Sequence, residues 1–270
     1  MLKRFLLLIF IHLVAATWGV AQVITVCTWN LKDFGKSKTD DEISYIAGTL
    51  KDFDIVAIQE VVAGDGGAQT VAQLQDVLNR KGAKWDYTIS NPTSGSYKTE
   101  RYAYLWKTKK ITKVGNAWLE KNYAVEIERE PYFCTFKSGN LFFTLVNFHA
   151  VTKSQQPERE IKYFKFMPAE YASLNLIFCG DFNCPSTHTV FNPLKSLGYT
   201  PALQGQKTSL RQCCINDDCL ASAYDNIFYN SYKIKIVEAG IVHFYKDFVS
   251  FDAARHLSDH VPVYIKFSAK

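Results

Sequence analysis

An acid and an amide stand two residues apart in the segment Phe178-Cys179-Gly180-Asp181-Phe182-Asn183. The mostly apolar run over residues 174–179 predicts a buried strand that ends at Gly180. Because side chains alternate along an extended chain, Asp181 and Asn183 should point to the same side. Two oxygen-bearing side chains at a strand end can hold a hard cation or orient a phosphate, although one such pair fits a turn closed by an Asx cap equally well.

Five further motifs place polar or ionisable residues at predicted strand ends. In chain order they are Thr28-Trp29-Asn30-Leu31, Ile58-Gln59-Glu60-Val61, Asn147-Phe148-His149, Tyr224-Asp225-Asn226-Ile227 and Ser258-Asp259-His260-Val261-Pro262. Together with Gly-Asp-Phe-Asn they resemble the endonuclease/exonuclease/phosphatase superfamily, whose fold is shared with deoxyribonuclease I. One such motif is weak evidence, whereas six in the same order are strong. The resemblance runs from about residue 23 to residue 267.

One loop narrows the resemblance to the deoxyribonuclease I branch. Ser96-Tyr97-Lys98-Thr99-Glu100-Arg101-Tyr102 is similar to the Ser-Tyr-Lys-Glu-Arg-Tyr segment of that branch, with Thr99 as an additional residue. The insertion leaves two alignments of Tyr97 and Lys98 open. Asn30-Leu31-Lys32-Asp33-Phe34-Gly35 and Arg129-Glu130-Pro131 also resemble the branch. The chain departs from it at Val62, where the branch often has an arginine that contacts DNA.

Strands and helices alternate irregularly along the chain. Strands are expected at 23–30, 54–58, 102–106, 131–136, 141–148, 174–179 and 261–267, and near Ile227 and Ile234. Helices are expected after a capping box at Thr39–Glu42, over residues 71–78, and over 157–166 with Pro168 as the stop. This α/β pattern predicts two packed mixed β-sheets flanked by helices. The resemblance implies the four-layer α/β sandwich of deoxyribonuclease I.

The candidate metal ligands carry only oxygen donors. They are Asn30, Glu60, Asp181, Asn183 and Asp259. Cleaving a phosphodiester brings an anionic nucleophile to an anionic phosphorus, and a divalent cation offsets that charge. Hard cations prefer oxygen ligands, and the chain has no Cys/His cluster with zinc spacing. We therefore expect Mg²⁺ or Mn²⁺, and whether Ca²⁺ also binds stays open.

Two histidines at strand ends, His149 and His260, can supply acid–base catalysis. The resemblance implies that Glu100 orients His149 and that Asp225 orients His260. Such a carboxylate fixes the tautomer and raises the basicity of the imidazole. One histidine can then deprotonate water while the other protonates the leaving oxygen, and the sequence leaves their assignment open. Asp181 and Asn183 complete the expected catalytic set.

Four residues are candidate DNA contacts: Arg101, Arg129, Tyr97 and Lys32. A guanidinium can grip two phosphate oxygens, whereas Tyr97 fits a minor-groove contact and an ordinary exposed loop aromatic equally well. Backbone contacts read little sequence, so the sequence predicts a monomeric endonuclease for double-stranded DNA with weak sequence preference. The alternatives are another phosphodiesterase or phosphatase of this fold, such as a sphingomyelinase-like enzyme, and a catalytically inactive binding module. Since no hydrophobic docking hairpin is evident, we expect no stable membrane association.

The N-terminus has the pattern of a signal peptide. Lys3-Arg4 precede the apolar run 5–16, and Gly19-Val20-Ala21 offers small residues for cleavage. We expect residues 1–21 to be removed near Ala21, which leaves a secreted or periplasmic single domain over 22–270; an uncleaved anchor is the alternative. Loss of Lys3 and Arg4 lowers the net charge from +5 to +3, which suits an anionic partner.

Seven cysteines in an exported chain suggest at least one disulfide. Three of them, Cys27, Cys134 and Cys179, lie in apolar strands and are expected to be buried thiols. The others lie in predicted loops: Cys184, Cys213, Cys214 and Cys219. The resemblance implies a disulfide in this region, for which Cys184 and Cys219 are candidates, although the different spacing leaves the partner of Cys184 open.

Overall fold

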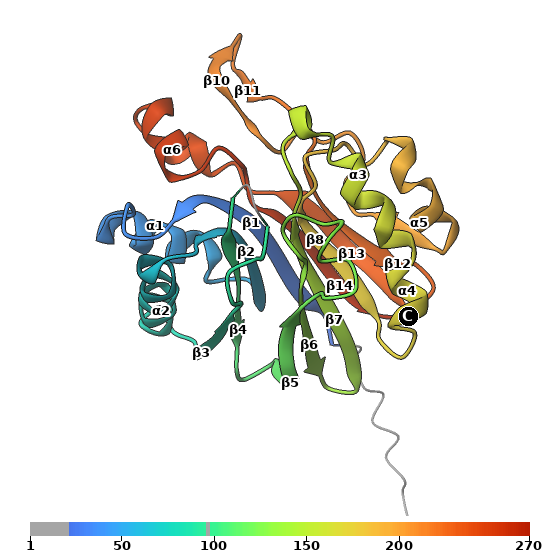
Figure 1. Ribbon diagram of the computed structural model, residues 1–270. Helices are drawn as coiled ribbons and strands as arrows, with labels where there is room; N and C mark the ends of the chain where they lie inside the picture. Colours follow the sequence, from blue (N-terminus) through green and yellow to red (C-terminus); the bar gives the residue numbers. More distant parts are fainter. Residues whose placement is uncertain (1–21, 96–97) are drawn as a thin grey trace, which may run out of the picture.

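Two six-stranded mixed β-sheets face each other, and helices cover the outer side of each sheet (Figure 1). This computed structural model describes residues 22–95 and 98–270. The first sheet has the order β13 (Ile234–Ile241), β14 (Val263–Ala269), β1 (Ile24–Phe34), β2 (Ile55–Val62), β4 (Glu100–Lys107) and β3 (Trp85–Ile89). The second has the order β5 (Thr112–Leu119), β6 (Tyr132–Ser138), β7 (Leu141–His149), β8 (Leu176–Asp181), β12 (Asp225–Asn230) and β9 (Tyr199–Pro201).

The remaining elements cover the sheets or project from them. The first sheet is covered by α1 (Asp40–Leu50), α2 (Asp65–Asn79), η4 (Phe244–Asp247) and α6 (Phe251–Leu257). The second is covered by α3 (Glu158–Ile161), η2 (Lys162–Lys165), α4 (Met167–Glu170), η3 (Thr189–Phe191) and α5 (Asn192–Ser196), with η1 (Lys153–Gln155) just before them. A hairpin of β10 (Leu210–Ile215) and β11 (Asp218–Leu220) projects away from the sheets (Figure 1).

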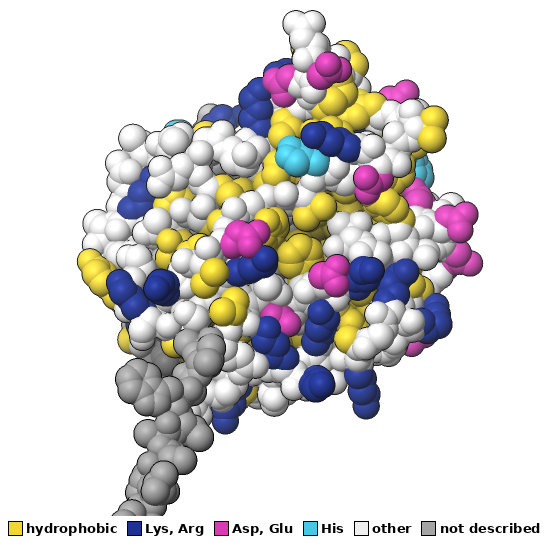
Figure 2. All heavy atoms as spheres, turned by 180° about the vertical axis from the view of Figure 1, so that it is seen from behind, with side chains coloured by type: hydrophobic (Ala, Val, Ile, Leu, Met, Phe, Trp, Pro, Cys, Tyr) yellow, Lys and Arg dark blue, Asp and Glu magenta, His cyan; other side chains and the backbone are white. Residues whose placement is uncertain are grey.

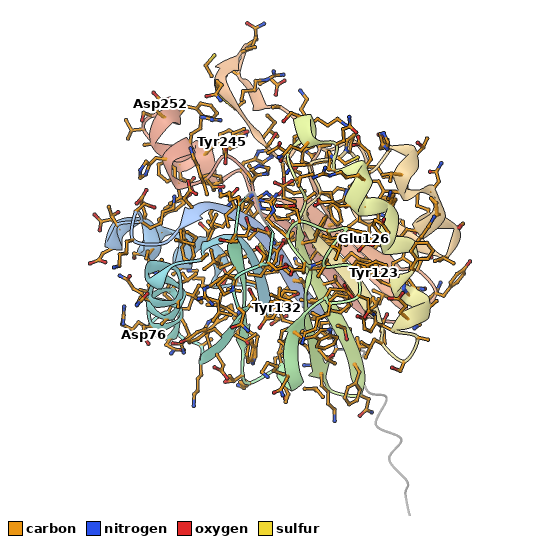
Figure 3. The ribbon with its side chains drawn as sticks, viewed as in Figure 1. Asp76, Tyr123, Glu126, Tyr132, Tyr245 and Asp252 are labelled. Carbon is orange, nitrogen blue, oxygen red and sulfur yellow. A yellow bond between two sulfur atoms is a disulfide. The ribbon has the colours of Figure 1, made fainter. Side chains whose placement is uncertain are left out.

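Three separate apolar clusters fill the three spaces between these layers. One lies between the first sheet and its helices, one between the two sheets, and one between the second sheet and its helices. Side chains of β1 alternate between them: Ile24 and Val26 face the other sheet, whereas Cys27 and Trp29 face the helices. Figure 3 shows side chains between the sheets, where buried Tyr132 stacks on Tyr104. The predicted four-layer α/β sandwich is therefore confirmed.

Parallel pairing brings the polar strand ends to one edge of the molecule. β1 pairs with β2 in parallel, and β7 pairs with β8 in parallel. The carboxyl ends of parallel neighbours lie at the same sheet edge. β12 runs the opposite way and starts at this edge, where Asp225 stands opposite Asp181.

The structure refines several predicted elements. The capping box of α1 is confirmed, since the side chain of Thr39 accepts from the N–H of Glu42 and Glu42 accepts from the N–H of Thr39. The single helix predicted over 157–166 is wrong, because this stretch breaks into α3 and η2. Pro168 lies in the first turn of α4, where no backbone donor is needed, so it begins a helix instead of ending one.

The disulfide predicted between Cys184 and Cys219 is wrong. Cys219 is bonded to Cys214 across the β10–β11 hairpin, with their Cα atoms 4.1 Å apart. Cys184 is a free thiol buried in the apolar cluster between the second sheet and its helices. The three strand cysteines, Cys27, Cys134 and Cys179, are buried and free as predicted. Cys213 is free and exposed.

Basic side chains are spread over the lower part of the face shown in Figure 2, with acidic side chains among them. The lysines near the end of β4 belong to the end of the first sheet opposite the polar edge. Lys107 lies over the ring of Trp85, and Lys110 pairs with Asp54 at 2.6 Å. They therefore form a solvated surface and not part of the candidate site. No helix of the described residues is long and apolar enough to cross a membrane, and the predicted signal peptide lies outside those residues.

Candidate active site

His149 ends β7 and is held by a carboxylate from the opposite sheet. Its Nδ1 lies 3.0 Å from both carboxylate oxygens of Glu100, the first residue of β4. Nη1 of Arg129 donates to Oε2 of Glu100 at 3.1 Å, and its Nη2 donates to the carbonyl of Ala150. Both Glu100 and His149 are buried, at 1% and 5% exposure. The imidazole is thereby left with Nε2 facing the centre of the site.

His260 forms a second histidine–carboxylate pair, again across the two sheets. Its Nδ1 lies 2.7 Å from Oδ2 of Asp225, and the hydroxyl of Thr208 donates to the same oxygen at 2.7 Å. Burial alone would lower the pKa of His260, but Asp225, Asp181 and Asp259 raise it well above its usual value. Burial also raises the pKa of Asp225, so this pair retains a proton.

Asp181 lies between the two histidines. Its Oδ2 is 3.6 Å from Nε2 of His149 and 3.5 Å from Nε2 of His260. Its Oδ1 accepts the backbone N–H of Asn183 at 2.9 Å, while the amide of Asn183 donates to the carbonyl of Ala150 at 3.1 Å. Asn183 has a φ of 47°, in the left-handed region that asparagine tolerates. The strand end thus aims one carboxylate at both imidazoles.

Glu60 reaches the same centre from a bulge in β2. Its Oε1 accepts Nδ2 of Asn30 at 3.2 Å and lies 3.9 Å from Nε2 of His149. Its Oε2 accepts the N–H of Asp33 at 3.2 Å and lies 3.5 Å from Nζ of Lys98. Burial would raise the pKa of Glu60, but His149, Lys98 and these hydrogen bonds outweigh it and lower the pKa to about 2. Glu60 is therefore anionic at neutral pH.

The donor set around Asn30 fits a hard divalent cation. Nδ2 of Asn30 bridges Glu60 and Asp181, at 3.2 Å from an oxygen of each, while its buried Oδ1 has no hydrogen-bond partner among the described residues. A half-turn of the amide would exchange the two atoms and place Oδ1 beside the two carboxylates. Two carboxylates and one amide oxygen are ligands of the kind that Mg²⁺ and Mn²⁺ take.

The other predicted metal ligand and the DNA contacts are placed less centrally. Asp259 is half-buried, and its carboxylate makes no hydrogen bond or ion pair with any residue that the structure describes. Arg101 donates from Nε to the carbonyl of Ala63 at 3.0 Å and from Nη1 to that of Ser90 at 2.8 Å. Lys32 is half-buried in β1, two residues after Asn30, and Tyr97 lies outside the described residues.

Two residues of the site, Lys98 and Thr208, were not among the predicted site residues. Lys98 pairs with Glu60 and with Asp33, each at 3.5 Å. Thr208 positions Asp225, and no sequence signal marks it because it is a single hydroxyl in a predicted loop. A cavity of about 100 Å³ adjoins these groups and is lined by Glu60, Lys98, Glu128, Arg129, His149, Val151, Thr152 and Gln155.

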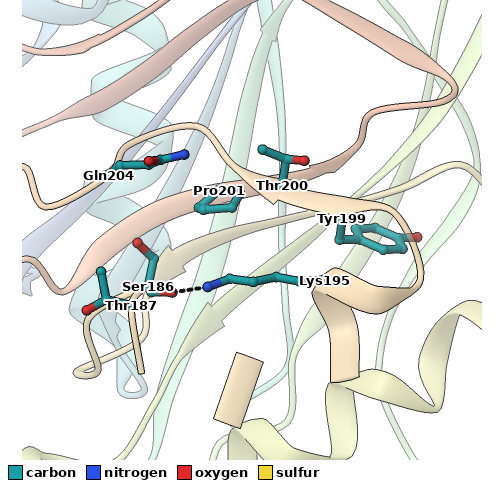
Figure 4. A pocket seen from close by; sticks show the side chains of 7 residues that line it. All are labelled: Ser186, Thr187, Lys195, Tyr199, Thr200, Pro201 and Gln204. Atoms are coloured by element: carbon teal, nitrogen blue, oxygen red, sulfur yellow. Dashed lines mark hydrogen bonds between the residues drawn. The ribbon is translucent and has the colours of Figure 1, made fainter. Parts of the chain in front are cut away.

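A separate hollow of about 340 Å³ lies beside α5 and β9 (Figure 4). It is lined by Ser186, Thr187, Lys195, Tyr199, Thr200, Pro201 and Gln204, and Nζ of Lys195 donates to the carbonyl of Ser186 at 2.6 Å. No acid or histidine lines this hollow, so it lacks the carboxylates and imidazoles that meet around Asp181.

Comparison with known proteins finds deoxyribonucleases among the chain's relatives and a phosphatase among proteins of the same fold. A deoxyribonuclease of Thioalkalivibrio sp. (strain K90mix) is 27% identical over 90% of this chain and 71% of its own length. Deoxyribonuclease gamma of Rattus norvegicus is 24% identical over 91% of this chain and 85% of its own. A mannosyl-6-phosphatase of Bacteroides thetaiotaomicron shares the fold, with a TM-score of 0.68 at 18% identity over 90% of this chain and 99% of that one. The model of the Endonuclease/Exonuclease/phosphatase family matches residues 27–260, and the chain belongs to that family, in its deoxyribonuclease I-like branch.

Proposed function

We propose that the protein is a divalent-metal-dependent endonuclease that hydrolyses phosphodiester bonds of double-stranded DNA with little sequence preference. We further propose that it acts outside the cytoplasm after removal of residues 1–21. The observation that carries the proposal is Asp181, which lies within 3.6 Å of both imidazoles while each imidazole is backed by its own carboxylate. Deoxyribonucleases among the relatives favour DNA as the substrate.

The residues divide the chemistry between them. Glu60, Asp181 and Asn30 would hold the cation, with Asn183 and Asp259 as further candidates; when bound, the ion would offset phosphate charge and acidify a water molecule. Glu100 and Asp225 keep a proton on Nδ1 of their histidines, so each Nε2 faces the scissile phosphate. One Nε2 takes the proton of the attacking water and the other gives a proton to the leaving oxygen.

A plasmid assay tests the proposal directly. We expect supercoiled plasmid to become open-circular before any ladder of fragments appears, because an endonuclease cuts internal bonds at random. Sphingomyelin and p-nitrophenyl phosphate are tested beside the plasmid. They distinguish an endonuclease from a sphingomyelinase-like enzyme and from a phosphatase of this fold. Stepwise release of mononucleotides, or faster turnover of the lipid or the monoester, would refute the endonuclease assignment.

DNA binding should depend strongly on salt. Phosphate contacts release counterions, so the slope of log K against log salt should be about −0.9 for each phosphate that is neutralised. The candidates are Arg129 and Lys98, which line the cavity beside Glu60 and His149, and Lys32 on β1. Fluorescence anisotropy with duplexes of unrelated sequence measures the slope, and a salt-independent affinity or a strong sequence preference would contradict this prediction.

Tyr97 should matter for cleavage of DNA and much less for hydrolysis of a small substrate. We expect Tyr97→Ala to lower plasmid cleavage well beyond its effect on bis-p-nitrophenyl phosphate, which has no neighbouring nucleotides for Tyr97 to contact. Arg101→Ala is a poorer probe, since Arg101 also ties β4 to the carbonyls of Ala63 and Ser90. Equal losses of Tyr97→Ala on the two substrates would mean that Tyr97 does not contact the duplex.

A further inference from the structure

The carboxylate of Glu60 depends on a local irregularity of β2. Ile58 pairs with Ala103 of β4, but the next pair joins Val61 to Arg101, so two residues of β2 stand opposite the single residue Tyr102. This is a β-bulge, which turns the strand and redirects a side chain. Glu60 itself has a φ of 59°, in the left-handed region that costs energy for a residue other than glycine. Such a conformation persists only where its surroundings hold it in place.

The residue that holds the bulge comes from the other sheet. Asn147 of β7 is fully buried, and its Nδ2 donates to the carbonyl of Ile58 at 3.0 Å and to that of Ala103 at 3.4 Å. These carbonyls belong to the last residues that pair before the bulge. Oδ1 of Asn147 accepts Nε2 of Gln59 at 2.5 Å, and Gln59 also donates to Thr28 of β1 at 2.9 Å. One amide therefore contacts both strands at the bulge and the residue next to Glu60.

Asn147 is also two residues before His149 on the same strand. A second contact joins the region of the bulge to the end of β7. The hydroxyl of Tyr102, which stands opposite the bulge, accepts the backbone N–H of His149 at 3.2 Å. We propose that Asn147 is a positioning residue, which fixes the Glu60 bulge to β7 and so sets Glu60 relative to His149. The proposal deepens the proposed function and rests on it wherever activity is the measure.

The test compares two variants of β7. Asn147→Leu keeps the size of the side chain and removes its donors and acceptor. Leu145→Ala is the matched control, because Leu145 lies on the same face of the same strand, is fully buried, and packs only in the apolar cluster between the sheets. Thermal unfolding gives the stability of each variant. The activities of the two variants can then be compared with the loss of stability known for each.

Two measurements on these variants decide the question. We expect Asn147→Leu to lower kcat on plasmid DNA by about 10–100-fold, the range found when a supporting partner of a catalytic group is lost, with a small change in KM. Leu145→Ala should change kcat by less than about threefold on the same scale. In hydrogen–deuterium exchange without metal or substrate, Asn147→Leu should speed exchange at residues 58–62 relative to 132–138, whereas Leu145→Ala should not.

Losses of kcat that simply follow the loss of stability in both variants, or unchanged exchange at residues 58–62 in Asn147→Leu, would overturn the proposal. A wild-type protein that cleaves no phosphodiester would refute the proposed function instead, while exchange would still decide whether Asn147 holds the bulge. If Asn147→Leu fails to fold, Asn147→Ser replaces it. A serine hydroxyl can donate to only one of the carbonyls of Ile58 and Ala103. The kcat of Asn147→Ser should therefore still fall further than that of Leu145→Ala.

Discussion

Alanine in place of His149 or His260 should lower the turnover of plasmid DNA by on the order of 10²–10⁴-fold, the usual contribution of a general acid or base. Each imidazole has Nδ1 held by a buried carboxylate and Nε2 within 3.6 Å of Asp181, so each is positioned to transfer a proton at the centre of the site. Initial rates of nicking at saturating DNA, with circular dichroism to check the fold, give the measurement.

His256 offers a matched control for these variants. It also forms a histidine–carboxylate pair, with Nδ1 2.7 Å from Glu42, but this pair is on the surface at α1 and α6. His256→Ala should leave the rate of nicking unchanged. If a folded His149 or His260 variant keeps more than about a tenth of the wild-type rate, its role as an acid or base is wrong.

The same variants can assign the two roles. Bis-p-nitrophenyl phosphate releases a stable phenolate, which needs little protonation on leaving. DNA releases an alkoxide, which is a poor leaving group unless it is protonated. The variant that lacks the general acid should therefore lose much less activity on the small substrate than on DNA. The variant that lacks the general base should lose comparable activity on both.

Removing the metal should abolish DNA cleavage, and excess Mg²⁺ or Mn²⁺ should restore it. Glu60→Gln gives the sharper result, because glutamine keeps the shape and one hydrogen-bonding oxygen while it removes the charge. We expect the free Mg²⁺ concentration for half-maximal rate to rise by at least about tenfold. Rates over a series of buffered free Mg²⁺ concentrations measure this shift.

Glu238→Gln is the control for this series. Glu238 is exposed on β13 and pairs with Lys266 at 2.6 Å, and it makes no contact with the groups around Asp181 among the described residues. Its variant should follow the wild-type dependence on Mg²⁺. Full cleavage of plasmid after exhaustive chelation would contradict the metal requirement itself.

Residues at strand ends were predictable because short motifs determine them locally. Asp181 and Asn183 follow an apolar run directly, His149 ends β7, and Glu60 lies two residues before the end of β2, so the motifs located these residues at or near their strand ends. The broken helix at 158–165 was not predictable, since its apolar spacing is helical throughout and only tertiary packing selects 3₁₀ geometry at η2.

Other features depend on partners far away in the sequence. Thr208 gains its place because the chain returns beside Asp225, and Asn147 meets Ile58 only after two sheets have packed together. Cys213 and Cys214 are closer to Cys219 along the chain than Cys184 is, but the resemblance favoured Cys184, which is the wrong partner. The turn of the β10–β11 hairpin brings Cys214 beside Cys219 and so determines the pairing. This hairpin was not predicted from the sequence.

Both histidine–carboxylate pairs take one member from each sheet. Glu100 belongs to β4 and His149 to β7, while Asp225 belongs to β12 and His260 lies just before β14. Neither sheet alone contains a complete pair, so the proposed nuclease activity cannot appear until the sheets have docked in register. During refolding from denaturant, the return of cleavage should therefore report the docking of the two sheets, and we expect it to lag behind the return of secondary structure measured in the same sample.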